Sequence, residues 1–412
     1  MRVLLLNQAF YPDIASTAQH LTELARALAS NGHEVDVIAS QRAYDNPQRR
    51  YAPRESWRGV AIRRVWMTGF GKLAKWRRAV DFATFCFSAA LQLLFARRPD
   101  VVIALTSPPL ISFFGACFSV VKRCRFIYWI MDLNPDEAIA AGWLREQSLA
   151  GRVLHWLSVF SLKRADSVIV LDRFMRDRVL AKGIVPDKIH VLPPWSHENE
   201  VAVDSAGRRR FRSQHQLSDK FVVMYSGNHS LCHPLDTLLQ AARELVADHS
   251  IQFCFVGGGS EFAKVQRFAA ENHLSNILCL PYQPLRELGA SLSAADLHVV
   301  VMGNPFVGTI HPCKIYNILA IHCPFLYIGP TESHVMDIIA SLGRPNMSPA
   351  AAHGDTASVI RHIKAVQTLA QRGDSEAFQR MADEFSGNKL IPQFLRFAGL
   401  YPKCETARAP DL

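Results

Sequence analysis

The sequence lacks an uninterrupted apolar stretch of the length that crosses a membrane. Two uncharged and largely apolar segments, residues 82–96 and 105–121, fall short of the roughly 20 residues that a helical span needs. The second segment also contains the pair Pro108-Pro109. The N-terminal stretch MRVLLLNQAFYP becomes polar too soon for a signal peptide. We therefore expect core or interfacial helices in both segments, and a cytoplasmic protein.

Cysteine is scarce and follows no pattern. The nine cysteines form no C-x-x-C pair, and no group of cysteines and histidines has the spacing of a zinc site. They are expected to be small buried residues in a reducing compartment. The dinucleotide fingerprint G-x-G-x-x-G is also missing, because Phe262 stands where the glycine run 257–259 would need a third glycine. These absences disfavour a metal site and a nicotinamide enzyme.

Acidic residues are outnumbered in the first half of the chain. Residues 1–200 hold 27 basic against 18 acidic residues, whereas residues 201–412 hold 19 against 18. The densest basic run, residues 54–78, is interleaved with four aromatic residues, Trp57, Trp66, Phe70 and Trp76. Such a run suits anionic lipid headgroups or nucleic acid, and a solvated loop is the ordinary alternative. Because no basic recognition helix or RNA motif accompanies it, we expect an anionic membrane surface and no nucleic acid as partner.

Apolar runs of strand length alternate with segments of helical period. RVLLLNQ, STAQHLTELARALASNG and EVDVIAS open the series, which pauses at residues 196–215 and resumes with FVVMYSGN. This alternation is typical of parallel, doubly wound sheets. It predicts an α/β protein with two Rossmann-like domains facing each other across a cleft, at residues 1–205 and 206–385. Residues 386–412 are predicted to form a helical return to the first domain and a tail. Since ligands of such sheets bind at the carboxyl ends of the strands, a two-substrate enzyme is favoured.

Three loops of the second predicted domain are candidates for binding an anionic ligand. Each follows a strand and leads into a helix, whose first backbone N–H groups attract anions. We expect these helices to begin near Pro234 and Pro312 in the first and third loops. The glycine run of the second loop either lets the backbone approach a ligand closely or only forms a tight turn. The residues of interest are Gly227, Asn228 and His233, then Gly257, Gly258 and Gly259, and finally Lys314 and Asn317 within GTIHPCKIYNILA (308–320).

The order of the motifs resembles a known family. A strand ending in SGN is followed by GGGSE, LPYQP, AADLHVV and PCKIYNILA, and residues 7–40, IMDLNPDEA and VLPPWSHEN precede them. This order resembles the group-1 (family 4) glycosyltransferases of GT-B fold over most of residues 1–330. More narrowly, it is similar to the bacterial O-antigen and exopolysaccharide branch, including N-acetyl-fucosaminyl and N-acetyl-hexosaminyl transferases. The resemblance implies a UDP-sugar donor on the second domain, an acceptor on the first, no metal, no cofactor, and usually retention at the anomeric carbon.

Charged residues that the wider family uses are missing from this chain. Asn228 and His233 stand where its phosphate loop usually has Arg and Lys. Thr309 and Asn317 stand where its E-x7-E element has two glutamates, of which the second holds the donor ribose. The glycines of its first-domain loop are replaced in DIASTA (13–18). Neutralisation of the donor diphosphate is therefore expected from Lys314 and from the helix N-terminus at Pro312.

In the first predicted domain, Asp132 closes the buried apolar run FIYWIMDL. Its carboxylate either faces the cleft as a catalytic group or caps the next turn, and we favour the catalytic role. Asp136 and Glu137 fall at a helix start, where acidic residues are ordinary. Contact with the acceptor or plain packing and capping are the alternatives for three residues of the first helix, Ser16, Thr17 and His20.

The sequence thus predicts a metal-independent hexosyltransferase. It would move an N-acetylated or deoxy hexose from a UDP-sugar to a polyprenyl-diphosphate-linked saccharide in surface polysaccharide synthesis. The protein would be peripheral on the inner face of the cell membrane. Two alternatives stay open: a GT-B nucleotide-sugar epimerase, which needs no acceptor, and an inactive sugar-binding homologue, which the missing glutamates favour.

Overall fold

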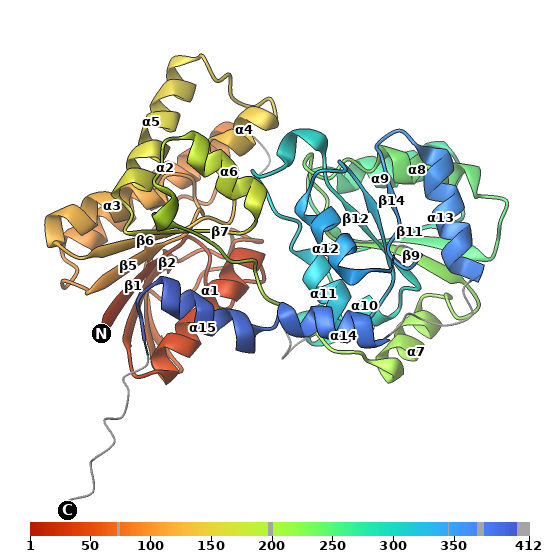
Figure 1. Ribbon diagram of the computed structural model, residues 1–412, viewed down its shortest axis with the longest axis horizontal. Coiled ribbons are helices and arrows are strands. Elements are labelled where there is room, and N and C mark those ends of the chain that lie inside the picture. The colour runs from red at the N-terminus through yellow and green to blue at the C-terminus, as the bar shows by residue number, and fades with distance from the viewer. Residues whose placement is uncertain (72–74, 197–200, 345, 369–374, 402–412) are drawn as a thin grey trace, which may run out of the picture. The chain divides into compact units, whose positions relative to one another are not determined.

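The computed structural model describes residues 1–71, 75–196, 201–344, 346–368 and 375–401 (Figure 1). The chain folds into two compact units, one of residues 1–193 with the C-terminal segment from Ile391, and one of residues 194–390. Lys72 of the basic run, residues 197–199 of VLPPWSHEN and the tail after residue 401 lie outside the described residues. The domain limits predicted at 205 and 385 stay predictions.

The first unit is built on an eight-stranded sheet in the order β3-β4-β2-β1-β5-β6-β7-β8. All neighbouring strands are parallel except β3 and β4, which pair antiparallel at one edge. The central strands are continuous apolar runs because helices cover both faces of the sheet. The strands are β1 (Arg2–Leu6), β2 (Glu34–Ser40), β3 (Arg54–Trp57), β4 (Val60–Val65), β5 (Val101–Ala104), β6 (Arg125–Trp129), β7 (Ser167–Val170) and β8 (Ile189–Val191).

Helices lie on both faces of this sheet. Figure 1 shows α2, α3, α5 and α6 on one face and α1 with α15 on the other. The helices are α1 (Ser16–Ser30), α2 (Lys75–Leu94), α3 (Ile111–Lys122), α4 (Asp136–Ala140), α5 (Leu149–Arg164), α6 (Arg173–Ala181) and α15 (Gly387–Phe397), with a 3-10 turn η1 (Pro186–Lys188). The two apolar segments 82–96 and 105–121 fall largely in α2 and α3. Among the described residues, every helix is too short or too polar to span a bilayer.

The C-terminal helix packs on the first unit, as the sequence predicts. The Phe394 ring meets Trp129 of β6 edge-on, with the ring centroids 4.7 Å apart. Phe397 stacks on His190 of β8 at 4.4 Å. Arg125 adds a hydrogen bond from its guanidinium to the Ala398 carbonyl. A buried aromatic contact and a charge-assisted hydrogen bond therefore hold the returning segment.

The second unit has a six-stranded parallel sheet in the order β11-β10-β9-β12-β13-β14. Two apolar cores cover its faces, one formed with α8, α9 and α13 and the other with α7, α10, α11, α12 and α14. The strands are β9 (Phe221–Asn228), β10 (Ile251–Gly258), β11 (Ile277–Leu280), β12 (Leu297–Val301), β13 (Phe325–Ile328) and β14 (Ala350–Ala351). The helices are α7 (Ser205–Gln214), α8 (Asp236–Glu244), α9 (Phe262–Glu271), α10 (Leu288–Ser293), α11 (Lys314–Ala320), α12 (His334–Leu342), α13 (Thr356–Thr368) and α14 (Ser375–Glu384), with 3-10 turns η2 (Leu285–Glu287) and η3 (Asn304–Phe306). The predicted α/β class with two Rossmann-like units is confirmed.

Candidate functional site

In the second unit, the predicted glycine loops meet at the carboxyl ends of β9 and β10. Gly227 pairs with Gly257 across the two strands. A Cβ added at Gly257 would lie 2.1 Å from the Gly227 carbonyl oxygen, and one at Gly259 would lie 2.3 Å from the His229 carbonyl oxygen. Both glycines also have a positive φ, of 133° and 127°. The close approach of the two loops therefore requires glycine at 257 and 259, whether or not a ligand is bound.

Hydrogen bonds between these loops use some of the N–H groups that were expected to face an anion. The His229 N–H donates to the Gly258 carbonyl at 2.8 Å, and the Glu261 N–H donates to the His229 carbonyl at 3.0 Å. Asn228 is exposed at the end of β9. The Asn228 side chain and the ammonium group of Lys314 are therefore better placed to bind a ligand than these two backbone N–H groups.

Lys314 is the main candidate for binding an anion at the carboxyl ends of β9 and β10. It is the first residue of α11, and its ammonium nitrogen lies 3.4 Å from the centroid of the Tyr225 ring, a cation–π contact with β9. The same nitrogen would be 3.5 Å from a Cβ placed on Gly227, so the side chain reaches the end of that strand. The nitrogen is buried and has no hydrogen-bond partner among the described residues. Burial holds its pKa well below the usual value.

Two histidines beside Lys314 are neutral. The Nδ1 of His229 lies 3.0 Å from the Gly227 carbonyl, and the Nδ1 of His233 lies 2.7 Å from the Val301 carbonyl. Because a carbonyl only accepts, each Nδ1 carries the proton and each Nε2 has a free lone pair. Burial, and then the charge of Lys314, lowers the pKa of His229 to about 4 and that of His233 to about 3. His233 is therefore suited to accept a hydroxyl hydrogen bond and unsuited to bind phosphate.

The stretch 308–320 differs from its predicted geometry at one point. α11 begins at Lys314 with Cys313 in the N-cap position, so the prediction that Pro312 occupies the first turn is wrong. Thr309 is fully buried, and its hydroxyl donates to the Phe306 carbonyl at 2.9 Å. Asn317 lies three residues after Lys314 on the same side of the helix. Lys314 and Asn317 thus remain together as ligand candidates, whereas Thr309 is a core residue.

In the first unit, Asp132 lies in the loop that follows β6, where its backbone N–H donates to the Thr106 hydroxyl oxygen at 3.3 Å. Burial raises the pKa of the Asp132 carboxyl, the nearby Glu137 raises it further, and Arg78 of α2 lowers it. Burial also raises the pKa of Glu137, against the effects of Arg78 and of Asn134, whose amide donates to it at 3.4 Å. Two partly buried carboxyls and one guanidinium thus form a cluster.

Of the three members of this cluster, the sequence predicts a catalytic role for Asp132 alone. Glu137 does lie in the first turn of α4, as expected, but it also interacts with Asp132. Asp136, its neighbour, has the ordinary structural role that we predicted, since both of its oxygens accept from the Lys182 ammonium at 2.9 Å. Arg78 was assigned to the surface basic run, and nothing local in the sequence indicates that it faces Asp132.

The predicted residues of α1 have mainly local contacts. Ala15 occupies the N-cap position and no side chain caps the helix, so the capping role suggested for Ser16 and Thr17 is wrong. His20 is buried, and its Nδ1 donates to the Ser16 carbonyl at 2.7 Å. Contact of these residues with an acceptor stays a prediction.

The basic run 54–78 is not a single solvated surface. Arg64 is only 4% exposed, pairs with Glu55 at 2.5 Å and donates to the Tyr11 carbonyl at 2.7 Å. Among the aromatic residues of the run, Trp66, Phe70 and Trp76 are exposed. A second exposed group lies farther on, at the end of α2 and just beyond it, and consists of Phe87, Leu91, Leu94, Phe95, Arg97 and Arg98.

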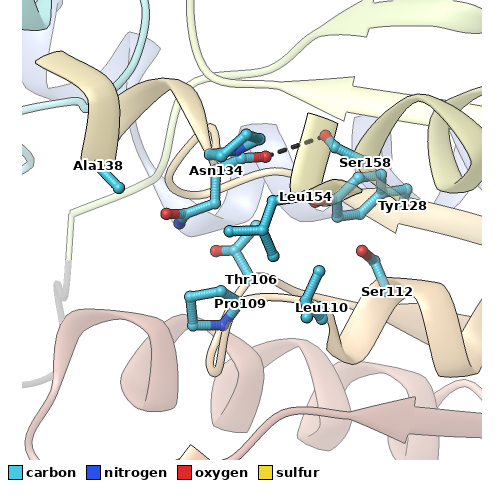
Figure 2. A pocket seen from close by; sticks show the side chains of 10 residues that line it. Thr106, Pro109, Leu110, Ser112, Tyr128, Asn134, Ala138, Leu154 and Ser158 are labelled. Atoms are coloured by element: carbon cyan, nitrogen blue, oxygen red, sulfur yellow. Dashed lines mark hydrogen bonds between the residues drawn. The ribbon is translucent and has the colours of Figure 1, made fainter. Parts of the chain in front are cut away.

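A cavity of about 120 Å³ lies beside the Asp132 loop in the first unit (Figure 2). Asn134, which lies in that loop, and Thr106, which lies in the neighbouring loop after β5, both line it. The remaining lining residues are Pro109, Leu110, Ser112, Tyr128, Pro135, Ala138, Leu154 and Ser158. The cavity is therefore formed by the same segments that position the carboxyl pair.

Comparison with known proteins assigns this architecture. Residues 17–195 match the family model described as glycosyl transferase 4-like domain. The chain is 26% identical over 339 residues to a protein of Escherichia coli strain K12, WcaI, named as a colanic acid biosynthesis glycosyl transferase, covering 78% of this chain and 81% of that protein. It is 26% identical over 262 residues to WbjE of Pseudomonas aeruginosa, named as a glycosyltransferase, covering 64% of this chain and 65% of that protein.

A solved structure extends the likeness to both units. The Anabaena protein Alr3699/HepE in complex with UDP-glucose superimposes with a TM-score of 0.72 at 14% identity, covering 97% of this chain and 100% of that one. At that identity, the likeness concerns the fold alone. The chain has the GT-B fold, its residues 17–195 match the glycosyl transferase 4-like domain, and it is similar to proteins named as glycosyltransferases of polysaccharide biosynthesis.

Proposed function

We propose that the protein is a glycosyltransferase that moves an N-acetylated or deoxy hexose from a UDP-sugar to a polyprenyl-diphosphate-linked saccharide during surface polysaccharide synthesis. The named relatives support the reaction class, since WcaI is assigned by name to colanic acid biosynthesis. The solved complexes of Alr3699/HepE with UDP and with UDP-glucose support the donor class.

Lys314 is the observation that carries the donor proposal. A buried amine without a hydrogen-bond partner is unfavourable, and an anionic oxygen would supply the missing acceptor. A diphosphate placed at the ends of β9 and β10 would meet this charge, so the leaving group would be stabilised without a metal ion. Asn317 would hydrogen-bond the donor ribose from the same side of α11, in place of the family's second glutamate.

The carboxyl pair of the first unit is proposed to act on the acceptor. Because burial and Glu137 raise the pKa of the Asp132 carboxyl well above that of an ordinary aspartate, its ionised form is a stronger proton acceptor. Arg78 favours the charged form of the pair, so one carboxylate can orient and polarise the acceptor hydroxyl. Transfer then requires little covalent chemistry from the protein beyond holding the two substrates in line.

The test is to incubate the protein with a panel of UDP-sugars, with and without a polyprenyl-diphosphate-linked saccharide, in buffer containing a chelator. We expect UDP release and an elongated lipid product only when both substrates are present. A new free nucleotide-sugar formed without acceptor would identify an epimerase instead. Binding of UDP with neither product across the panel would identify an inactive homologue.

We also propose that the protein binds the anionic inner face of the cell membrane. The proposal rests on the exposed residues at the end of α2 and not on the whole basic run 54–78. Arg64 of that run pairs with Glu55, and Arg78 acts on Asp132, so neither is a free surface charge. Replacing Arg97 and Arg98 by serine should weaken sedimentation with anionic liposomes by about 1 kcal/mol per charge. Replacing the exposed Arg209 and Arg267 of the second unit makes the same change in net charge and should have no effect. Equal binding to neutral vesicles would contradict the proposal.

A further inference from the structure

The cavity beside the Asp132 loop has a distinct composition. Its lining comes from the loop after β5, the start of α3, strand β6, helix α4 and helix α5, and Figure 2 shows these side chains around one space. Leu110, Leu154 and Ala138 give it apolar walls, and Pro109 and Pro135 add to them. With about 120 Å³ it approaches the 150 Å³ of an engineered apolar cavity that admits benzene.

The hydroxyl groups in the lining already have partners within the protein. Ser158 donates to the Asn134 carbonyl at 2.9 Å, the contact drawn in Figure 2. Thr106 accepts from the Asp132 N–H. Ser112 hydrogen-bonds the Tyr128 hydroxyl, whose pKa burial raises to about 12. A sugar ring in this space would leave several of its own hydroxyls without partners, which disfavours it. A branched hydrocarbon group of about five carbons has the right size and polarity.

An exposed apolar stripe lies on α5, one of the helices that line the cavity. Leu149, Val153 and Trp156 lie at helical spacing on α5, the helix that also supplies Leu154 and Ser158, and they are 79%, 47% and 60% exposed. The Trp156 ring lies 6.4 Å from that of Phe113 on α3. A hydrocarbon chain leaving the cavity along α5 would therefore meet apolar surface that nothing else in the described chain covers.

We propose that the cavity binds one isoprene unit of the lipid-linked acceptor and that the following units lie along the α5 stripe. This inference rests on the proposed function, because it supplies the lipid part of that acceptor. Its consequence is recognition of the acceptor through its lipid as well as its saccharide. Holding an isoprene unit one loop away from Asp132 would position the saccharide near the carboxyl pair.

Geranyl diphosphate, with two isoprene units, is the probe, and binding is measured by calorimetry without any UDP-sugar. Ala138→Phe fills the cavity from α4, and Leu154→Phe fills it from α5. Ala140→Phe is the matched control, because it adds the same side chain to α4 away from the lining. We expect both filling variants to bind geranyl diphosphate at least tenfold more weakly than wild type, with the control unchanged. Inorganic diphosphate should not distinguish the four proteins.

Failure of this inference and failure of the proposed function give different results. If no UDP-sugar supports transfer but the filling variants still lose geranyl diphosphate, the cavity is a prenyl site in a protein with another activity. If transfer occurs, the filling variants should raise KM for a prenyl-linked acceptor and leave KM for a short-alkyl acceptor unchanged. Unchanged geranyl diphosphate affinity in a filling variant with wild-type melting temperature would overturn the inference. An equal rise in KM for both acceptors would overturn it too, because the cavity would then hold saccharide.

Discussion

The two units bury opposite kinds of charge in segments that follow the carboxyl ends of their strands, and burial shifts the pKa values of these groups in opposite directions. In the second unit a single amine, Lys314, has a pKa held well below its usual value. In the first unit the carboxyls of Asp132 and Glu137 have raised pKa values; Arg78 opposes the shift of both, and the Asn134 amide also opposes that of Glu137. Desolvation drives both groups towards their neutral forms. The units differ in what would restore the charge: a diphosphate for the amine, and a guanidinium already in place for the carboxyls.

The largest expected effect comes from removing the carboxylate. Asp132→Asn should cut kcat by about a hundredfold or more, because an amide cannot take up the proton of the attacking hydroxyl group. UDP affinity, measured by calorimetry, should stay close to that of wild type, since the proposed donor contacts are in the second unit. Asp136→Asn is the matched control, because that carboxylate is paired with Lys182 and is assigned no part in the reaction. Normal turnover in Asp132→Asn would remove the carboxyl pair from the mechanism.

Removing the Lys314 amine tests the proposed role of the second unit in binding the donor diphosphate. Lys314→Ala should weaken UDP and UDP-sugar binding by about 1.5–3 kcal/mol, the scale of a charged hydrogen bond. Uridine, which has no phosphate, should bind the variant and wild type alike. Asn317→Ala should show the other selectivity and weaken uridine and UDP equally. Unchanged UDP affinity in Lys314→Ala would direct attention to other groups at the ends of β9 and β10.

The sequence predicts the sheets and the loops of these sites well, because both depend on periodicity and on short motifs. Tertiary contacts are what it does not reveal. Arg78 reaches the Asp132 cluster from a helix more than fifty residues earlier, and the contact between Lys314 and Tyr225 joins α11 to β9. Neither contact produces a local sequence pattern from which it could be predicted. The start of α11 was misplaced by two residues, an ordinary error for a helix end.

Arg64 is different, because the sequence does carry a signal for its burial. On β4 the buried Val60 and Ile62 alternate with the less buried Ala61 and Arg63. The period of two places Arg64 on the same face as Val60 and Ile62. Counting Arg64 as part of a basic surface gives more weight to local charge density than to strand alternation. The burial of Arg64, which pairs with the exposed Glu55 at the edge of the sheet, corrects this.

A smaller effect concerns proton uptake on donor binding. UDP should favour the charged form of Lys314 and raise its pKa, so the complex binds more protons than the free protein between the two pKa values. In that range UDP affinity should fall as pH rises, by at most tenfold per unit for one proton. Heats of UDP binding measured in buffers of different ionisation enthalpy report the uptake directly. His229 and His233 lie near Lys314, but pKa values of about 4 and 3 keep them neutral in this range. Lys314→Met should abolish the buffer dependence, and a variant that keeps it would place the proton elsewhere.

The smallest expected effects are on stability, where the two clusters should have opposite pH dependence. For Lys314 the unfolded chain binds more protons between the depressed pKa and about 10.5, so stability rises with pH in that window. For Asp132 the folded protein binds more protons above about 3.8, so its contribution falls as pH rises through the raised pKa. Lys314→Met should stabilise the empty protein by about 1 kcal/mol, the cost of an unpartnered buried group, or roughly 2–4 °C for a unit of this size. Melting curves across pH should show Lys314→Met removing a rising slope and Asp132→Asn removing a falling one. Two variants with slopes of the same sign would mean that one of these groups is not desolvated in solution, and the comparison between the units would then fail.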